Sequence, residues 1–191
     1  MSGLRAPAEV LPRRQQWGFA RIASKEIPMP ANRSLEVTVH FTGSQASDGS
    51  YSGAATYFQT GSSHPLTLVA PTGDINLESL QHDPDYNWAI GMTFKLDATV
   101  VDRHGNAVAC TWASPLSRAC AITGPGAAPA TGMAVSQPHA TQIHIANIND
   151  DRDKAHPDDR SYDYKLGVML PSVDNYFISL DPKITNTGPL T

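Results

Sequence analysis

The stretch that decides the fold is Ser34–Thr42, which reads SLEVTVHFT. Apolar and polar residues alternate along it, and the apolar ones are Leu35, Val37, Val39 and Phe41. Successive side chains of a β-strand point to opposite faces, so this period of two predicts a strand with one buried face and one solvated face. Antiparallel sheets are the usual setting for such half-buried strands.

The same alternation recurs in residues 92–100, where one face would carry Phe94, Leu96, Ala98 and Val100. The segment Asp102–Asn106 follows, and its Gly105 can adopt the positive φ that tight turns require. We expect Ala107–Ala113 to return as the partner strand of a hairpin. One side of that strand would carry Val108, Cys110 and Trp112.

Other short β-prone runs are spread along the rest of the chain, whereas no window has the apolar spacing of an amphipathic helix. These runs are Tyr51–Gln59, His64–Ala70, His139–Asn149, Tyr162–Leu170 and Tyr176–Leu180, the last two joined by a turn at Pro171–Asn175. Residues 123–138 are rich in Gly, Pro and Ala, which predicts a long crossover loop. The pattern predicts an all-β fold: an antiparallel β-sandwich, Ig-like or jelly-roll-like, with long loops and little helix.

Length and composition limit the class of protein. The 191 residues suit a single domain, 1–191, with an extended N-terminal segment at about 1–33. Hydrophobic residues make up 40% of the chain and charged residues 17%, a composition too apolar for wholesale disorder. The net charge of −4 lacks the basic footprint of a nucleic-acid binder. No run approaches 18 apolar residues and no secretory signal is recognisable, so we expect no membrane span and a cytoplasmic location, with non-Sec export left open.

Two cysteines, Cys110 and Cys120, are too few for a four-ligand zinc site. In a reducing cytosol they would be small core residues. A disulfide that closes a hairpin is the alternative if the protein is exported. Histidines give no metal motif either: His139 and His144 are five residues apart, which on a single strand places them on opposite faces.

The segment Asn149–Asp163 is dense in acidic residues. Carboxylate oxygens are the ligands that Ca²⁺ prefers, which makes Asp150, Asp151 and Asp153 candidate calcium ligands. The spacing does not follow the twelve-residue calcium loop, and basic residues partly neutralise the run. We therefore favour a solvated acidic loop and no cofactor, with calcium as the alternative.

The triplet Tyr86-Asn87-Trp88 is the candidate ligand-binding segment. An exposed aromatic ring beside an amide could stack on a sugar, whereas a Trp between two sheets is the structural alternative. Nucleophile-elbow, phosphate-loop and dinucleotide-binding motifs are all missing, so the sequence offers no catalytic residues.

The C-terminal part resembles a known family. Its elements are Ser161–Val168, then Asn175–Phe177 and Asp181–Ile184, which form an aromatic strand, a turn and a second aromatic strand that ends on Asp-Pro-Lys-Ile. This arrangement is similar to the C-terminal end of the PixA/AidA-type inclusion-body proteins of bacteria. The resemblance implies a compact β-sandwich without catalysis, in proteins that accumulate or self-assemble inside the cell.

These observations favour a non-enzymatic β-sandwich that acts by self-association or partner binding, as a homo-oligomer. The first alternative is a lectin-like module that binds carbohydrate, with or without calcium. The second is an enzyme of unrecognised type.

Overall fold

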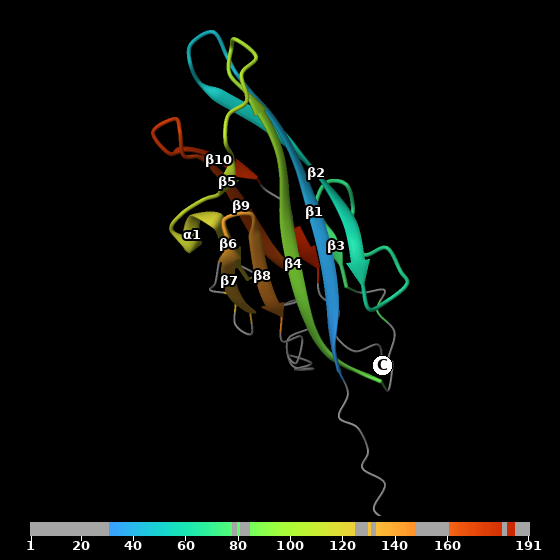
Figure 1. Cartoon of the computed structure of the whole chain (residues 1–191). Helices are drawn as coiled ribbons and strands as arrows, with labels where there is room; N and C mark the ends of the chain where they lie inside the picture. The colour runs from blue at the N-terminus through green and yellow to red at the C-terminus, as the bar shows by residue number, and fades with distance from the viewer. Residues whose placement is uncertain are drawn as a thin grey trace, which may run out of the picture.

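The computed structural model describes residues 31–77, 80, 85–124, 130, 133–147, 161–180 and 183–185. Over this part of the chain the expectation of an all-β fold with little helix is confirmed. The elements are β1 (Ala31–Gln45), β2 (Tyr51–Ser62), β3 (Ile75–Asn76), β4 (Tyr86–Val101), β5 (Thr111–Trp112), α1 (Leu116–Ala119), β6 (Cys120–Thr123), β7 (Met133–His139), β8 (Gln142–Asn147), β9 (Ser161–Leu170), β10 (Tyr176–Leu180) and β11 (Lys183–Thr185) (Figure 1). Of the expected N-terminal extension, residues 1–30 lie outside the described part and 31–33 belong to β1.

The strands form two sheets. The first sheet has the order β2-β1-β4-β8-β7. The second has the order β10-β9-β11-β3, and β5 and β6 also pair along β9. The pairing is mixed rather than antiparallel throughout, because β1 runs parallel to β4 and β11 runs parallel to β3. The parallel β1–β4 pair arises because the chain passes through β3 in the second sheet before it returns beside β1.

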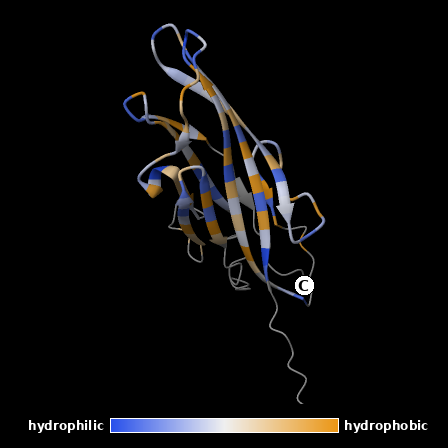
Figure 2. Cartoon of the chain, in the orientation of Figure 1, coloured by the Kyte–Doolittle hydropathy of each residue, from blue (hydrophilic) through white to orange (hydrophobic). Residues whose placement is uncertain are grey.

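The alternation in Ser34–Thr42 has the predicted effect on β1. Its apolar side chains, Leu35, Val37, Val39 and Phe41, are at most 1% exposed. The residues between them lie on the other face of the sheet and are half-buried or exposed. Figure 2 shows the same change between hydrophobic and hydrophilic residues along β1 and β4. The buried face of the first sheet is therefore encoded by local periodicity.

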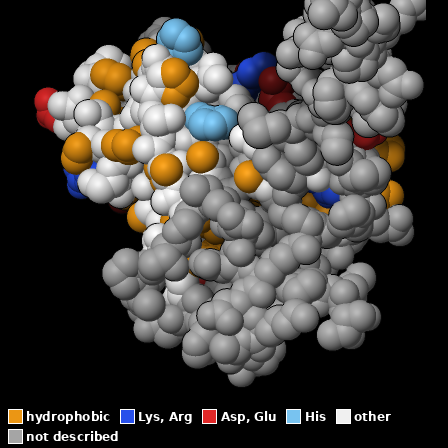
Figure 3. Space-filling view, turned by 90° about the horizontal axis from the view of Figure 1, so that it is seen from below, with side chains coloured by type: hydrophobic (Ala, Val, Ile, Leu, Met, Phe, Trp, Pro, Cys, Tyr) orange, Lys and Arg blue, Asp and Glu red, His pale blue; other side chains and the backbone are white. Residues whose placement is uncertain are grey.

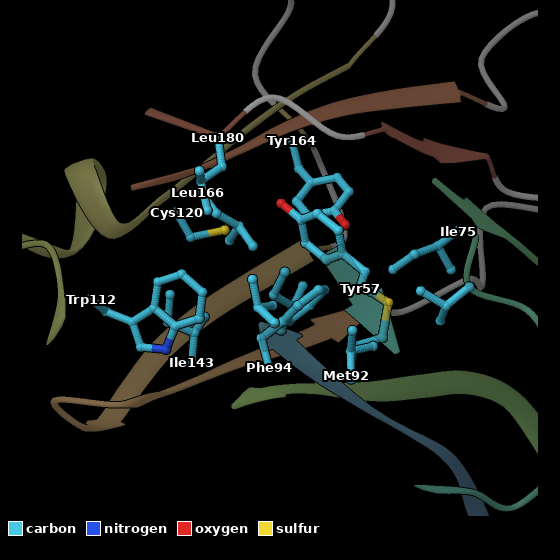
Figure 4. Packing of buried hydrophobic residues seen from close by; sticks show 14 of the residues in the cluster. Tyr57, Ile75, Met92, Phe94, Trp112, Cys120, Ile143, Tyr164, Leu166 and Leu180 are labelled. Carbon is cyan, nitrogen blue, oxygen red and sulfur yellow. The ribbon is translucent and has the colours of Figure 1, made fainter. Parts of the chain in front are cut away.

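Side chains from the two sheets meet in one hydrophobic core (Figure 4). Phe94 of β4 contacts Tyr164 of β9, with ring centroids 5.7 Å apart. Tyr51 of β2 and Tyr176 of β10 make a similar contact at 5.6 Å. Trp112 is 1% exposed, and Val108 and Cys110, which the sequence placed on the same side, are partly buried against the core.

The hairpin predicted at 92–113 is only partly formed. Asp102–Asn106 makes the expected turn, in which the Asp102 amide donates to the Asn106 carbonyl at 2.9 Å and Gly105 has a φ of 84°. The returning chain stays beside β4 only as far as the Val108 amide, which donates to the Val100 carbonyl. It then leaves for the second sheet, where β5 pairs with β9. The predicted partner strand is thus divided between two sheets.

Two other predicted segments differ from the structure. His64–Ala70 is not a strand: only Val69 makes a bridge, to Ile75, around a turn at Gly73. The predicted crossover loop 123–138 contains strand β7, which pairs with β8. Small residues and Pro138 are not typical of a strand, so the sequence pattern did not predict β7. The C-terminal hairpin is as predicted, with β9 and β10 joined by Pro171–Asn175.

Candidate functional site on the first sheet

Of the residues that the sequence predicted as ligands, the structure describes only the side chain of Tyr86. Tyr86 is half-buried at the start of β4, and the side chains of Asn87 and Trp88 lie outside the described part. Asp150, Asp151 and Asp153 also lie outside it. Among the residues that are described, no group of three or more His, Cys, Asp and Glu could hold a metal ion, and no helix could cross a membrane. The calcium and carbohydrate hypotheses remain predictions.

Polar side chains cover the outer face of the first sheet, the face turned away from the core. In the middle of this face, Lys95 Nζ of β4 lies 2.7 Å from Glu36 Oε2 of β1. Thr60 of β2 donates to the same carboxylate at 3.3 Å. One register step along, His40 Nδ1 and Asp97 Oδ2 are 3.0 Å apart. These partners are directly opposite or diagonal across strands, where side chains interact.

The environment of Glu36 favours its charged form. The hydrogen bond from Lys95 is the largest cause that lowers the pKa of Glu36 below its usual value, with a smaller contribution from Thr60. The carboxylate of Glu36 and the ammonium of Lys95 therefore pair with each other, and a ligand that binds either group would have to replace this contact. The Glu36–Lys95 pair is exposed, so it stabilises the fold by no more than about 1 kcal/mol.

The histidines do not form a pair. His139 and His144 were expected on a single strand, but they lie on β7 and β8. His144 contacts Thr93 Oγ1 through Nδ1 at 3.2 Å on the outer face. His139, at the end of β7, is in register with Gln142. Among the described residues, neither histidine has a hydrogen bond or ion pair to a carboxylate or a thiol.

Both cysteines are free, and their thiols are held protonated. Burial raises the pKa of Cys110 to about 11 and that of Cys120 to about 12. A thiolate, not a thiol, is the nucleophile and metal ligand. The environment of these two residues thus suits the predicted role of small core residues.

Two large hydrophobic side chains are exposed on the described part of the surface. Phe58 of β2 is 50% exposed and Leu66 is 40% exposed. In Figure 3 the hydrophobic side chains that are described form small separate groups among polar ones, and the histidines lie apart from the acidic residues. A large hydrophobic docking face is not visible on the described part of this side of the molecule.

The feature that sequence reasoning missed is the edge formed by β2. β2 is an outermost strand of the first sheet, and its sequence YSGAATYFQTGS contains no charged residue. Native sheets usually protect such edges with charges, proline or bulges. The absence of charge over twelve residues was the signal that could have drawn attention to it.

The backbone geometry shows which groups of β2 face outward. The Tyr57 amide donates to the Pro71 carbonyl at 3.1 Å, so it points away from β1. The register with β1 is unbroken from Tyr57 to Tyr51. Hydrogen-bonding direction alternates along an antiparallel strand, so the backbone groups of Tyr51, Gly53 and Ala55 also point away from β1. Within the described part of the chain, those of Gly53 and Ala55 have no hydrogen-bond partner.

The described residues cover one half of this edge. Beyond Tyr57, the Gln59 side chain donates to the Leu66 carbonyl at 2.8 Å and accepts from the Leu68 amide at 2.7 Å. The segment after β2 therefore folds back over the edge from Tyr57 onward. Residues 51–56 lack this cover. We call them the open edge.

Beside the open edge lies a shallow depression of about 440 Å³ at the end of the β1–β2 hairpin. Small residues line it: Thr42, Gly43, Ser44, Ser52, Gly53 and Ala54. None of them is charged, and the depression is wide open. Such a surface lacks the convergent polar groups of a small-molecule site.

The other outermost strand of the first sheet, β7, is protected differently. Its sequence MAVSQPH includes Pro138, which has no amide hydrogen to offer. Its pairing with β8 is also irregular between Ser136 and His139. A proline and an irregular register both discourage pairing with another chain. The two edges of the sheet are thus unequal.

Comparison of the chain with protein-family models, with curated proteins and with solved structures gave no match.

Proposed function

We propose that this chain is a non-enzymatic protein of the β-sandwich class that acts by self-association. The observation that carries the proposal is the open edge, because residues 51–56 combine outward backbone groups with a complete lack of charge. An unpaired, uncharged strand edge is a template for pairing with another chain. The resemblance of the C-terminal hairpin to inclusion-body proteins is in keeping with assembly inside a bacterial cell.

The chemistry of the described side chains also supports a binding role rather than catalysis. The charged groups on the outer face bond to one another, as Glu36 does with Lys95. The thiols are protonated at neutral pH because burial raises their pKa. Neither arrangement supplies the activated nucleophile or the poised acid and base of an active site.

The test is the mass of the purified full-length protein in solution, measured by light scattering after gel filtration across a wide concentration range. We expect a mass that is a multiple of the chain mass and that rises with concentration. A monomer at every concentration, up to millimolar, would overturn the proposal.

A further inference from the structure

We propose that the open edge of β2 pairs with the same edge of a second copy, antiparallel and about a two-fold axis at Gly53. This inference rests on the proposed self-association and names its interface. The partner is another copy of this chain, and the contact is made by main-chain hydrogen bonds that continue the first sheet from one molecule into the next.

The hydrogen-bonding pattern is self-complementary. Tyr51, Gly53 and Ala55 direct both their amide and their carbonyl away from β1, as the direction of the Tyr57 amide requires. In an antiparallel pair, two residues that face each other in this way exchange both hydrogen bonds. Centred on Gly53, the pairing places Gly53 opposite Gly53 of the other copy and Tyr51 opposite Ala55 of the other copy. Every outward group of the open edge then has a partner.

The length of the edge matches this register. β2 begins at Tyr51, and the chain before it turns back to β1 through a turn in which the Gly49 amide donates to the Ala46 carbonyl. A partner strand that starts at Tyr51 ends opposite Ala55. It therefore stops before Tyr57, where Pro71 already occupies the edge. The open edge of one copy is therefore as long as the strand segment of the other copy that pairs with it.

The side chains of the open edge allow two sheets to approach. Ser52 and Ala54 are exposed on the outer face, and in this register each lies opposite the other in the second copy. They are small and uncharged, so neither bulk nor repulsion keeps the strands apart. A contact of this size is below that of a standard stable interface, so we expect association that depends on concentration.

The test uses the full-length chain with pairs of exposed substitutions at positions 52 and 54. In the Ser52→Lys/Ala54→Lys variant, the two-fold register puts an introduced lysine opposite another at two places, and like charges directly opposite are destabilising. We expect association weaker by roughly tenfold or more. The Ser52→Lys/Ala54→Glu variant puts opposite charges at the same two places, and we expect it to associate at least as well as the wild type.

The matched control is Ala134→Lys/Ser136→Lys on β7, whose positions are also exposed and lie at the other edge of the sheet. We expect it to associate like the wild type. Melting temperatures of all three variants should stay within a few degrees of the wild type, because exposed substitutions seldom change stability by more than about 0.5 kcal/mol.

The outcomes separate the two proposals. A wild-type monomer at all concentrations contradicts the proposed function itself. If the wild type associates but the lysine pair on β2 has no effect, or the lysine pair on β7 dissociates it, self-association stands and the β2 interface is overturned. Equal weakening of the Lys/Lys and Lys/Glu variants also overturns the register centred on Gly53.

Discussion

Charged residues are present in the centre of the first sheet and absent from its open edge. In the centre, β1 and β4 carry Glu36, Lys95 and Asp97, although the backbones of both strands are already paired on both sides. At the edge, β2 carries no charged residue, although it has a strand on one side only. Charge protects a sheet from further pairing when it lies on an edge strand. Here it lies where such protection is not needed.

The difference shows that further strand pairing at the edges of this sheet is hindered by a covering loop and by proline rather than by charge. From Tyr57 onward, a loop that contains Pro71 occupies the edge. At β7, Pro138 removes a donor. Between Tyr51 and Thr56 the fold supplies neither device within the described residues. This open segment is where we propose that a second copy binds.

The largest expected effect compares two phenylalanines, one from the centre and one from the edge. Phe94 of β4 is fully buried, whereas Phe58 of β2 is 50% exposed. Phe94→Ala should cost roughly 3–5 kcal/mol through lost burial and the cavity left behind. Phe58→Ala should change stability by no more than about 0.5 kcal/mol. Urea unfolding of both variants measures the difference, and equal losses would contradict the assignment of Phe58 to the solvated face.

An intermediate effect is expected at Gly53, on the inner side of the open edge. A Cβ added there would lie 2.5 Å from both the Phe41 ring and the Thr42 carbonyl oxygen. Because backbone cannot move aside cheaply, Gly53→Ala should destabilise the monomer by about 1–3 kcal/mol. Ala54→Ser, one residue along on the exposed side, is the control and should be neutral. Thermal melts at a concentration where the protein is monomeric would reveal the contrast, and a neutral Gly53→Ala would show that the edge is loosely packed.

The smallest effect concerns the charges of the centre. Lys95 and Thr60 hold the pKa of Glu36 below its usual value of 4.5, so the charged carboxylate stabilises the native state. That contribution is fully present above pH 4.5 and is lost as the pH falls through the lowered native pKa. Glu36→Gln should therefore cost no more than about 1 kcal/mol at pH 7, and the deficit should shrink in acid.

Unfolding curves of Glu36→Gln and the wild type, recorded at pH 7 and at pH 3, measure that difference. A deficit that grows in acid would contradict the favourable pairing of Glu36 with Lys95. A deficit of several kcal/mol at pH 7 would contradict the placement of this pair on a solvated face.

The amino-acid sequence by itself determined which residues of the long strands point inward. Alternation at Leu35, Val37 and Val39 predicted the buried face of β1, and the Gly105 turn and the C-terminal hairpin were also recognisable. These features are local: the pleat fixes the face of each residue, and turn residues fix the backbone angles that they allow. Local chemistry is sufficient for them.

The tertiary structure alone decided which strands are neighbours and which edge stays open. The sequence did not reveal the parallel β1–β4 pair, the departure of β5 to the second sheet, or the loop that covers β2 from Tyr57 onward. Strand neighbours are selected by contacts between segments far apart in the chain, and alternation along one strand is the same whichever strand lies beside it. The open edge is a property of which backbone groups find partners, and no single segment encodes that.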